Sequence, residues 1–326
     1  MTAKSRRGFI VRPFTLLIKP SGPDCNINCS YCFYACKSSL FGGSRHRMSD
    51  EVLEKLVSSY LPLRFPNSSF AWQGGEPTLM GLDFFKRVVE LQRKYGEDGQ
   101  VVTNALQTNG ILLDDQWCKF LHEYKFLVGI SLDGPEKFHN HHRMDFSGKG
   151  TFDRVMASIE RCKQNKVEFN ILVLLSDHNV GHPDEIFDFF MEQKIRFLQF
   201  VQCVEPDPET GDVTDFSITP RQYGEFLCRI FDRWVEHGIT KLSVRTFDSL
   251  LSYCVGQGQT ECTFQHKCSD YIVVEHNGDV FCCDFFVEEQ WRIGNIMETP
   301  IEELASSKMK RQFSRQKQSI DNKCLI

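Results

Sequence analysis

Three cysteines near the start of the chain have a spacing that is typical of metal- or cluster-binding loops. The segment PDCNINCSYCFY (23–34) places Cys25, Cys29 and Cys32 in the pattern C-x3-C-x2-C. A structural zinc site normally has four protein ligands, and the neighbouring sequence offers no well-spaced fourth His or Cys. Three thiolates with one open position are better suited to a 4Fe-4S cluster, whose irons are ordinarily held by cysteine. An iron left uncapped in this way is a reactive position, so the segment predicts chemistry.

A second group of cysteines lies in the last quarter of the chain. Cys262 and Cys268 are spaced C-x5-C, and Cys283 lies near the end of a segment (270–285) that is predicted to be a β-hairpin with an Asn-Gly turn. The chain has fourteen cysteines in all. In a long chain without an export signal, reduced metal ligands are a better interpretation than disulfides. We therefore expect a cytoplasmic protein.

The overall composition argues against two classes of partner. The formal net charge is -5, which gives no reason to expect affinity for nucleic acid or for a membrane surface. No apolar segment reaches the roughly 18 residues that a transmembrane helix needs. The basic N-terminus, MTAKSRRGFIVRPFTLL, lacks the apolar core and the cleavage site of a signal peptide.

Six strand–helix units must position these residues. The expected strands are 14–20, 68–77, 101–110, 125–135, 167–175 and 196–203, and the expected helices are 50–61, 82–96, 114–124, 151–165, 183–194 and 219–238. This alternation predicts a parallel sheet whose apolar strands are buried on both faces. Six units are two fewer than a complete eight-fold barrel has, so a partial barrel and an open doubly wound sheet both remain possible.

The unusual residues of the barrel segment follow the predicted strands. QGGEP (73–77), LQTNG (106–110) and SLDGP (131–135) each stand where a strand ends, as the first cysteine group does. Sites in parallel α/β folds are built at this carboxyl edge of the sheet. After about residue 255 the pattern changes to the hairpin and a predicted helix over 300–313.

These motifs resemble a known family. A C-x3-C-x2-C motif after the first strand, with Tyr31 between its last two cysteines and GGEP after the second strand, resembles the radical S-adenosylmethionine (SAM) enzymes. The similarity is closer still to the anaerobic sulfatase-maturating enzymes. It is carried in order by LLIKP…CNINCSYCFY, FAWQGGEPTL, LQTNG, FLVGISLDGP, HNHHR, VEFNIL, FLQFVQC and WRIGNI, from about residue 14 to the end.

The resemblance implies a fold and a set of cofactors. Residues 14–240 would form a partial (β/α)6 TIM-like barrel, and residues 241–326 a small cysteine-bearing extension of the SPASM type. The first cysteine group would hold a 4Fe-4S cluster, with the amine and carboxylate of SAM on its open iron. The extension would carry one or two auxiliary 4Fe-4S clusters.

The resemblance also assigns residues to SAM. Gly75 would approach the amino group closely because glycine lacks a side chain, Ser131 would contact the ribose, and Leu198 would touch adenine. Arg143 would pair with the carboxylate, a geometry that a guanidinium suits. Tyr31 completes the predicted cofactor-binding set. Each residue also has an ordinary interpretation, such as a turn glycine or a core leucine, and adjacent histidines in HNHHR are a poor metal site.

The auxiliary clusters would use Cys262, Cys268, Cys283 and Cys324. Cys283 is preferred to its neighbour Cys282 because CDF matches the family's pattern. The family needs a further cysteine run, but only two residues follow Cys324. We therefore expect the chain to be a truncated fragment in which the second auxiliary cluster is incomplete.

Asp284 occupies the position of the family's proton acceptor, although a surface acid is the ordinary interpretation of such a residue. A nearby anionic cluster and partial burial would raise the pKa of its carboxyl group. The expected reaction is oxidation of a Cys or Ser to Cα-formylglycine through a 5'-deoxyadenosyl radical. The substrate would be an unfolded sulfatase segment of the C/S-x-P/A-x-R type, and a reduced electron donor would be needed. Another peptide maturase of the SPASM type, such as a thioether-forming enzyme, and a non-catalytic iron–sulfur or zinc-binding module are the alternatives.

Overall fold

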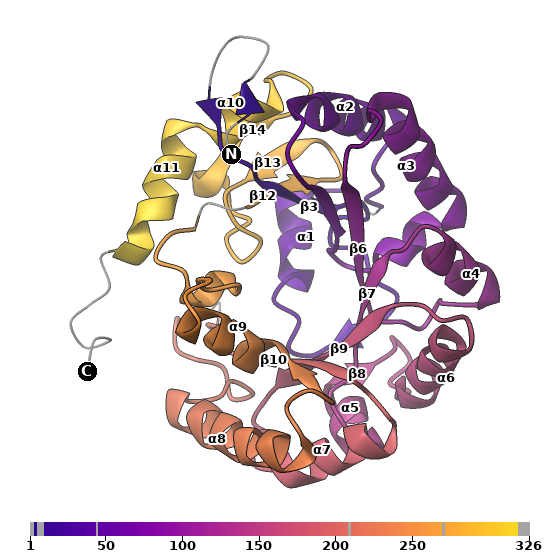
Figure 1. Cartoon of the computed structure of the whole chain (residues 1–326), viewed down its shortest axis with the longest axis vertical. Coiled ribbons are helices and arrows are strands. Elements are labelled where there is room, and N and C mark those ends of the chain that lie inside the picture. Colours follow the sequence, from indigo (N-terminus) through magenta and orange to yellow (C-terminus); the bar gives the residue numbers. More distant parts are fainter. Residues whose placement is uncertain (1–2, 5–9, 44, 208–209, 269–270, 319–326) are drawn as a thin grey trace.

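A largely parallel sheet forms the centre of the molecule (Figure 1). The computed structural model describes residues 3–4, 10–43, 45–207, 210–268 and 271–318. Its main sheet has ten strands in the order β11-β10-β9-β7-β6-β5-β3-β12-β13-β14. The six predicted barrel strands are all present and pair in parallel. They are β3 (Thr15–Lys19), β5 (Ser68–Trp72), β6 (Val102–Thr108), β7 (Leu127–Ser131), β9 (Phe169–Leu175) and β10 (Phe197–Gln202).

Six helices cover the outside of these strands (Figure 1). Local signals define their ends. Ser49 caps the first of them by accepting a hydrogen bond from the backbone of Val52 at 3.2 Å, and Thr219 forms a capping box with Gln222 at the start of the last. The helices are α2 (Asp50–Tyr60), α3 (Leu82–Tyr95), α4 (Asp115–Glu123), α6 (Phe152–Gln164), α7 (Pro183–Glu192) and α8 (Pro220–His237).

The two faces of the parallel strands differ in burial. Buried residues alternate with half-buried ones in β5 and β9. The buried set packs against the helices, as Trp72 does against Phe85 of α3 with ring centroids 5.6 Å apart. The prediction that both faces are buried is therefore wrong for the inner face. Since six strands do not complete a barrel, side chains such as Gln107 and Ser131 are left half-buried along its interior.

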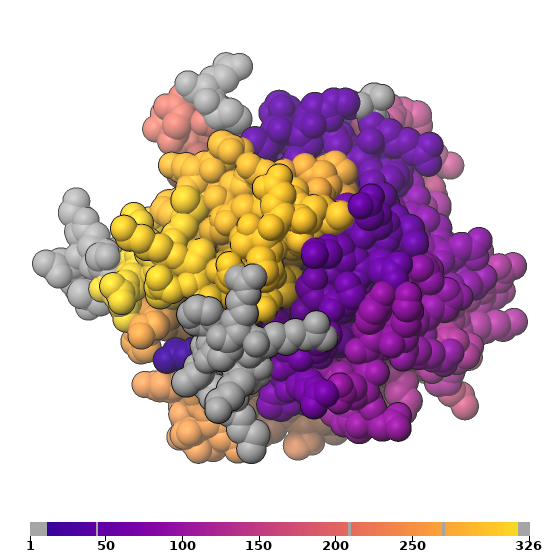
Figure 2. Space-filling model, turned by 90° about the horizontal axis from the view of Figure 1, so that it is seen from above, coloured from indigo at the N-terminus to yellow at the C-terminus, as the bar shows by residue number. Residues whose placement is uncertain are grey.

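The C-terminal region, residues 241–318 as described, continues the same sheet. Its strand β12 (Tyr271–Glu275) pairs in parallel with β3, and the predicted hairpin is formed by β12 and β13 (Asp279–Phe281). A last strand, β14 (Arg292–Asn295), pairs with β13. The space-filling view shows the end of this region lying directly against the N-terminal part of the chain (Figure 2).

The helix predicted over 300–313 is wrong as a single element. The structure has two helices, α10 (Ile301–Ala305) and α11 (Lys308–Arg315). The chain leaves the helical path at two adjacent serines, and Ser307 caps the second helix by accepting a hydrogen bond from the backbone of Lys310 at 3.1 Å. A serine side chain that bonds the backbone in this way favours a new helix start over a continuous helix.

Several short elements were not predicted. Near the first cysteine group these are η1 (Ala35–Lys37), α1 (Ser38–Phe41), β4 (Asn28–Cys29), α5 (Glu136–His142) and β8 (Arg143–Met144), and elsewhere they are β1 (Ala3–Lys4), β2 (Ile10–Val11), β11 (Ser243–Val244), α9 (Arg245–Cys254) and the 3-10 turns η2 (Leu61–Leu63), η3 (Pro77–Met80), η4 (Cys262–Phe264), η5 (Glu289–Trp291) and η6 (Gln316–Gln318). Within the described ranges, no helix has the length and apolar character needed to cross a membrane.

Candidate active site

The first cysteine group lies in the loop that follows β3, residues 20–34, which we call the cluster loop. Cys25, Cys29 and Cys32 are all free thiols and all half-buried. Burial raises the pKa of Cys25 to about 11, with Glu76 and then Cys32 adding to the rise, and burial raises the pKa of Cys29 to about 12, with Cys32 and Cys25 adding to it. The three sulfurs therefore interact with one another, and a cationic group bound among them would displace their protons. This donor set suits an iron–sulfur cluster.

A single metal ion is a different case. Among the residues that the structure describes, no three side chains of His, Cys, Asp or Glu lie close enough together to share one ion. A 4Fe-4S cluster distributes its cysteine ligands over separate irons, so it does not require that the three sulfurs meet at one point.

The GGEP segment after β5 is bound to the cluster loop through its backbone. The Gly75 N–H donates to the carbonyl of Gly22 at 2.8 Å, and the Glu76 N–H donates to the carbonyl of Asp24 at 2.8 Å. A Cβ atom at Gly75 would lie 2.0 Å from that Asp24 oxygen. The glycine at this position is therefore required by the cluster loop itself, in addition to the close approach to a cofactor that the sequence predicts.

Replacing Gly75 with alanine is expected to displace the cluster loop, because the clash is with backbone atoms and no side-chain rotation relieves it. Strain of this kind costs about 1–3 kcal/mol of unfolding free energy or more, and iron incorporation should fall with it. Denaturant unfolding and iron content per chain measure the two effects. Gly181→Ala is the matched control, since nothing lies within 4 Å of a Cβ there. Equal stability and iron content in both variants would contradict this explanation of Gly75.

The Glu76 side chain ties neighbouring strand ends together. It is fully buried and accepts hydrogen bonds from Thr78, from the Thr108 hydroxyl at 2.8 Å and from the Asn109 N–H at 2.8 Å. Burial raises the pKa of its carboxyl group, and these donors oppose the rise. The Asn109 side-chain amide in turn lies 3.7 Å from the sulfur of Cys25. The ends of β5 and β6 are thereby fixed to the first cysteine of the loop.

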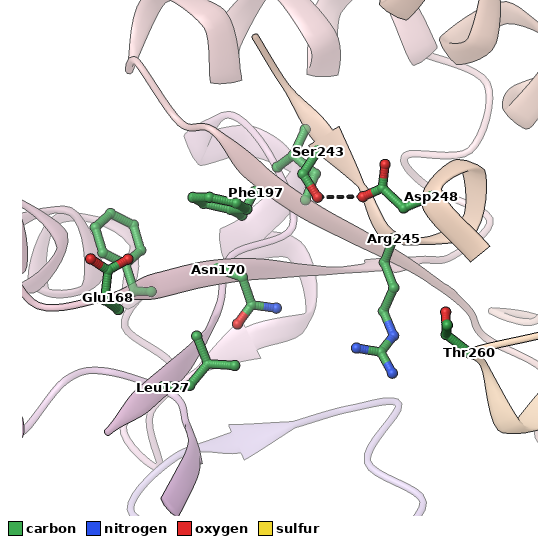
Figure 3. A pocket seen from close by; sticks show the side chains of 10 residues that line it. Leu127, Glu168, Asn170, Phe197, Ser243, Arg245, Asp248 and Thr260 are labelled. Atoms are coloured by element: carbon green, nitrogen blue, oxygen red, sulfur yellow. Dashed lines mark hydrogen bonds between the residues drawn. The ribbon is translucent and has the colours of Figure 1, made fainter. Parts of the chain in front are cut away.

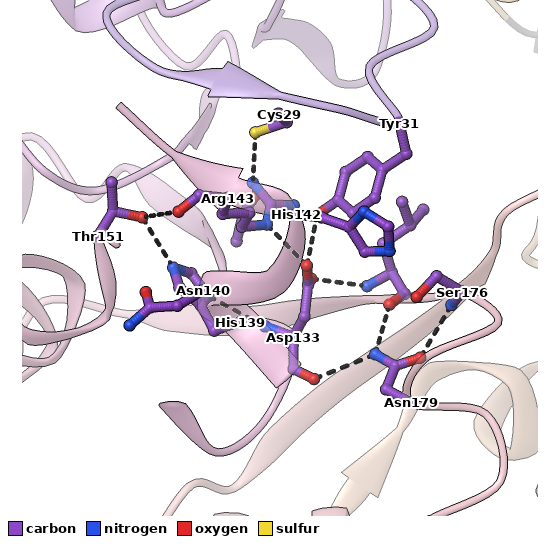
Figure 4. Close-up of polar contacts among 12 residues, drawn as sticks. Cys29, Tyr31, Asp133, His139, Asn140, His142, Arg143, Thr151, Ser176 and Asn179 are labelled. Atoms are coloured by element: carbon purple, nitrogen blue, oxygen red, sulfur yellow. Dashed lines mark hydrogen bonds and ion pairs between the residues drawn. The ribbon is translucent and has the colours of Figure 1, made fainter. Parts of the chain in front are cut away.

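Asp133, just after β7, is the centre of a second network (Figure 4). Its carboxylate accepts hydrogen bonds from the Tyr31 hydroxyl, from Arg143 Nε at 2.9 Å and from the Leu174 N–H at 3.0 Å. Only 2% of the Asp133 side chain is exposed, against 11% of the Arg143 side chain. A buried ion pair with further hydrogen bonds holds its members in one geometry.

A hydrogen-bonded ring fixes the backbone around this ion pair. The Asp133 N–H donates to His139 Nδ1 at 3.4 Å, the other imidazole nitrogen lies 3.0 Å from the Thr151 hydroxyl, and that hydroxyl donates to the Arg143 carbonyl at 2.9 Å. Burial lowers the pKa of His139 to about 3, so its imidazole is neutral and can accept at Nδ1. The first histidine of HNHHR is thus a structural hydrogen-bond bridge.

Arg143 also reaches the cluster loop. The Arg143 backbone is the register partner of Cys29 in the short antiparallel pair of β4 and β8. Its Nη1 lies 3.9 Å from the Cys29 sulfur. Ser131, at the end of β7, lies on the same edge and accepts a hydrogen bond from Gln107 at 3.2 Å. The structure therefore places Tyr31, Gly75 and Arg143 at the cluster loop, and Ser131 at the carboxyl end of a neighbouring strand.

Leu198 is not brought to this edge. It is the second residue of β10, it is buried, and it lines a pocket of about 410 Å³ at the opposite end of the strands with Asn170 and Arg245 (Figure 3). Its contact with adenine stays a prediction without geometric support. Val204 is the exposed apolar residue that follows β10 at the carboxyl edge. A prediction that took the first exposed apolar residue after the end of β10 would have chosen Val204 instead of Leu198 for the contact with adenine.

The second cysteine group lies beside the hairpin. Cys283 is buried, and burial raises the pKa of its thiol to about 11. The Tyr271 hydroxyl lies 3.0 Å from its sulfur, and Cys268 packs against the same cluster of side chains. Cys262 is exposed but interacts electrostatically with Cys268. Cys324 lies outside the described residues.

Asp284 is largely enclosed, since only 8% of the residue is exposed. Its Oδ1 accepts a hydrogen bond from the Tyr271 hydroxyl at 2.8 Å. Asp284 also interacts electrostatically with Lys19 and Tyr34, and the same two residues interact with Cys32 of the cluster loop. Tyr271 packs against the same side-chain cluster as Cys32, and also against the one that includes Cys268 and Cys283, so the residue that bonds Asp284 connects the two cysteine groups.

Comparison with known proteins agrees with this arrangement. The family model of the radical SAM superfamily matches residues 20–190, and that of an iron–sulfur cluster-binding domain matches residues 262–325. The cysteine-type anaerobic sulfatase-maturating enzyme of Clostridium perfringens is 40% identical over 315 residues, which are 96% of this chain and 85% of the relative. The serine-type enzyme of Bacteroides thetaiotaomicron is 37% identical over 330 residues, 96% of this chain and 80% of the relative.

A solved structure extends the comparison to the fold. Native anSMEcpe with bound AdoMet superposes with a TM-score of 0.90 at 40% identity, covering 96% of this chain and 86% of that one. The same protein with bound AdoMet and the Cp18Cys peptide gives a TM-score of 0.89. The chain belongs to the radical SAM superfamily and, within it, to the family of anaerobic sulfatase-maturating enzymes.

Proposed function

We propose that this protein oxidises a cysteine or serine in a sulfatase segment to Cα-formylglycine. The observation that carries the proposal is the position of Asp284, which is enclosed beside Cys283 and hydrogen-bonded to Tyr271, a residue that packs against the same side-chain cluster as Cys32 of the cluster loop. A carboxylate between two cysteine groups can accept a proton at the point where electrons are exchanged. Both family matches and the relatives' names support the proposal.

The proposed cofactors follow from the donor sets. Cys25, Cys29 and Cys32 would hold a 4Fe-4S cluster that binds SAM, and Tyr31, Gly75, Ser131, Arg143 and Leu198 are the residues proposed to contact SAM. When bound, the reduced cluster and SAM supply the chemistry that removes a hydrogen atom from the substrate's β-carbon. Cys262, Cys268, Cys283 and Cys324 are proposed as ligands of auxiliary clusters. We assign residues 14–240 to the barrel and 241–326 to the auxiliary-cluster region.

The roles of the chain's own residues can be stated for a cysteine substrate. The substrate side chain loses a hydrogen atom from its β-carbon, for which bound SAM would supply the accepting 5'-deoxyadenosyl radical, together with a proton from sulfur and one further electron, which an auxiliary cluster would accept. Water then replaces the sulfur, which leaves as hydrogen sulfide. Asp284 accepts the proton at a carboxylate oxygen. The Tyr271 hydroxyl orients this carboxylate by donating a hydrogen bond to its Oδ1 at 2.8 Å.

The substrate motif and the location are part of the same proposal. We propose that the peptide is of the C/S-x-P/A-x-R type and that an external reduced donor supplies electrons. A reducing cytoplasm would keep the free cysteines available as ligands.

Anaerobic reconstitution tests the proposed function. The chain with iron and sulfide is incubated with SAM, dithionite and a peptide carrying C-x-P-x-R, and a second reaction carries serine in its place. We expect 5'-deoxyadenosine together with the mass decrease of formylglycine formation in at least one peptide. Cleavage of SAM with an unchanged peptide mass would reject the sulfatase reading, and a thioether product would identify another peptide maturase.

Replacing Asp133 with asparagine is expected to weaken SAM binding by about 10–100-fold, the range found when an outer partner of a bound group is lost. The asparagine cannot neutralise Arg143, so the guanidinium is free to leave the orientation that Asp133 imposes. Equilibrium binding of SAM to the reconstituted variant measures the effect. Asp83→Asn, which changes an almost fully exposed acid on α3, is the control, and an unchanged affinity in Asp133→Asn would show that Arg143 needs no such partner.

A further inference from the structure

The last histidine of the HNHHR segment contacts the cluster loop directly. His142 ends α5, and only 6% of the residue is exposed. Its Nδ1 lies 2.6 Å from the Ser30 hydroxyl, a hydrogen bond between side chains that are 112 positions apart in the chain. The Ser30 N–H also donates to the His142 carbonyl at 3.1 Å. Ser30 is therefore bound to His142 through both its backbone and its side chain.

Tyr31, the next residue of the cluster loop, packs against the same imidazole (Figure 4). The two ring centroids are 4.9 Å apart, and the ring planes meet at 53°. The Arg143 guanidinium lies 5.4 Å from the Tyr31 ring centroid, and the Tyr31 hydroxyl donates to the Asp133 carboxylate. The position of Tyr31 thus depends on His142 at its ring and on Asp133 at its hydroxyl.

The residues held by His142 stand between two of the cysteines. Ser30 and Tyr31 are the two positions that separate Cys29 from Cys32 in the C-x3-C-x2-C pattern. A bound cluster needs its ligands in fixed relative positions, and the residues that hold the ligands from behind determine those positions. The β4–β8 pair fixes the backbone at Cys29. His142 adds support to the two residues that follow it.

The imidazole is itself held in one orientation. Its Nε2 lies 3.5 Å from the Asp177 carboxylate in the segment after β9. Its ring centroid lies 4.5 Å from that of His141 and 6.2 Å from that of Phe216. These neighbours leave Nδ1 directed at Ser30. A packing role would need only a ring of this size, whereas the short contact at Nδ1 needs a polar atom at that position.

We propose that His142 is a positioning residue for SAM: by bonding Ser30 at Nδ1 and packing against Tyr31, it holds the loop between Cys29 and Cys32 in the orientation that the cofactor site requires. The proposal rests on the proposed function only in that SAM is placed at the cluster loop. It does not depend on which peptide is modified. Its first readout is therefore the affinity for SAM rather than the yield of product.

His142→Asn and His142→Gln separate a positioning role from a packing role. The amide of asparagine is as many bonds from the backbone as Nδ1, whereas the amide of glutamine reaches the position of Nε2. Each amide can donate and accept, so the comparison holds for either imidazole tautomer. In equilibrium binding to the reconstituted protein, we expect SAM affinity within about threefold of wild type for His142→Asn and about 10–100-fold weaker for His142→Gln.

Removing the Ser30 hydroxyl tests the same hydrogen bond from its other end. Ser30→Ala should also weaken SAM binding. In the Ser30→Ala background, the difference between His142→Asn and His142→Gln should disappear, because changes that act through one bond are not additive. His122→Gln is the matched control and should leave binding unchanged, since His122 Nδ1 bonds the Lys166 carbonyl at 2.8 Å on the exposed side of α4.

Two further measurements distinguish an oriented loop from a folding defect. Iron content and kcat for 5'-deoxyadenosine should stay within about twofold of wild type in every variant, while KM for SAM rises in His142→Gln and Ser30→Ala. Amide hydrogen exchange in the segment 26–34 should be faster in these two variants than in wild type and in His142→Asn, because the loop has lost a contact that holds it.

The outcomes that overturn the proposal are specific. Equal SAM affinity in His142→Asn and His142→Gln contradicts it, as does a difference that persists in the Ser30→Ala background. If neither variant at position 142 folds, Ser30→Ala decides alone: unchanged SAM affinity rejects the inference, and weaker binding supports it. A wild-type chain that binds and cleaves SAM but forms no formylglycine rejects the proposed function and leaves the inference about His142 standing on its own test.

Discussion

Replacing Cys29 with alanine is expected to abolish cleavage of SAM. Cys29 lies in the β4–β8 ladder opposite Arg143, with its sulfur 3.9 Å from the guanidinium, so it is held more rigidly than a loop thiol. Losing one of three cluster ligands removes the reactive centre. The activity should therefore fall by more than the about 10–100-fold that is typical when a residue hydrogen-bonded to a metal ligand is lost. The measurement is 5'-deoxyadenosine formed from SAM and dithionite after anaerobic reconstitution.

Two comparisons make this result specific. Cys36→Ala is the matched control, because Cys36 is an exposed free thiol just beyond the C-x3-C-x2-C pattern and should leave cleavage unchanged. Iron bound to the second cysteine group should also remain in Cys29→Ala. Cleavage that survives in the Cys29 variant would show that the first group is not the site of the reactive cluster.

Replacing Asp284 with asparagine is expected to spare cleavage of SAM and to block product formation. Asparagine has the same shape and can still accept the hydrogen bond from Tyr271, but it cannot take up a proton at neutral pH. General-base catalysis is typically worth about 10²–10⁴-fold, and the yield of formylglycine should fall by this amount. Mass spectrometry of the peptide and chromatography of 5'-deoxyadenosine measure the two activities in one reaction.

The control for Asp284→Asn is Asp83→Asn, which makes the same change at an almost fully exposed acid on α3. Both activities should be unaffected there. Full product formation by Asp284→Asn would remove this residue from the catalytic role. Loss of iron together with both activities would show that Asp284 supports the second cysteine group rather than the reaction.

Much of the barrel is encoded locally and is therefore predictable. The strand and helix boundaries follow from apolar periodicity, from caps such as Ser49 and from turn residues. The helix over 300–313 was wrong because Ser306 and Ser307 compete locally for backbone hydrogen bonds. The burial of both strand faces was wrong because burial depends on whether the barrel closes, which no single segment determines.

Part of the candidate site was also predictable, because it too is encoded by residues close in sequence. Spacing selects Cys25, Cys29 and Cys32, because ligands of one cluster lie close in sequence. Leu198 was placed in the correct strand, but its end of the strand faces the pocket opposite the cysteines. A motif identifies a strand more reliably than it identifies the edge that a given residue reaches.

The sequence by itself determined the alternation of strands and helices, the cysteine spacings and the family, because these depend on neighbouring residues. Only the tertiary structure decided which distant residues share an environment. It joined Asp133 to Tyr31 and Arg143, and it placed Lys19 of the first barrel strand opposite Glu275 of the C-terminal region. The physical reason is that β12 pairs beside β3, and this long-range pairing brings charges from opposite ends of the chain into one buried space.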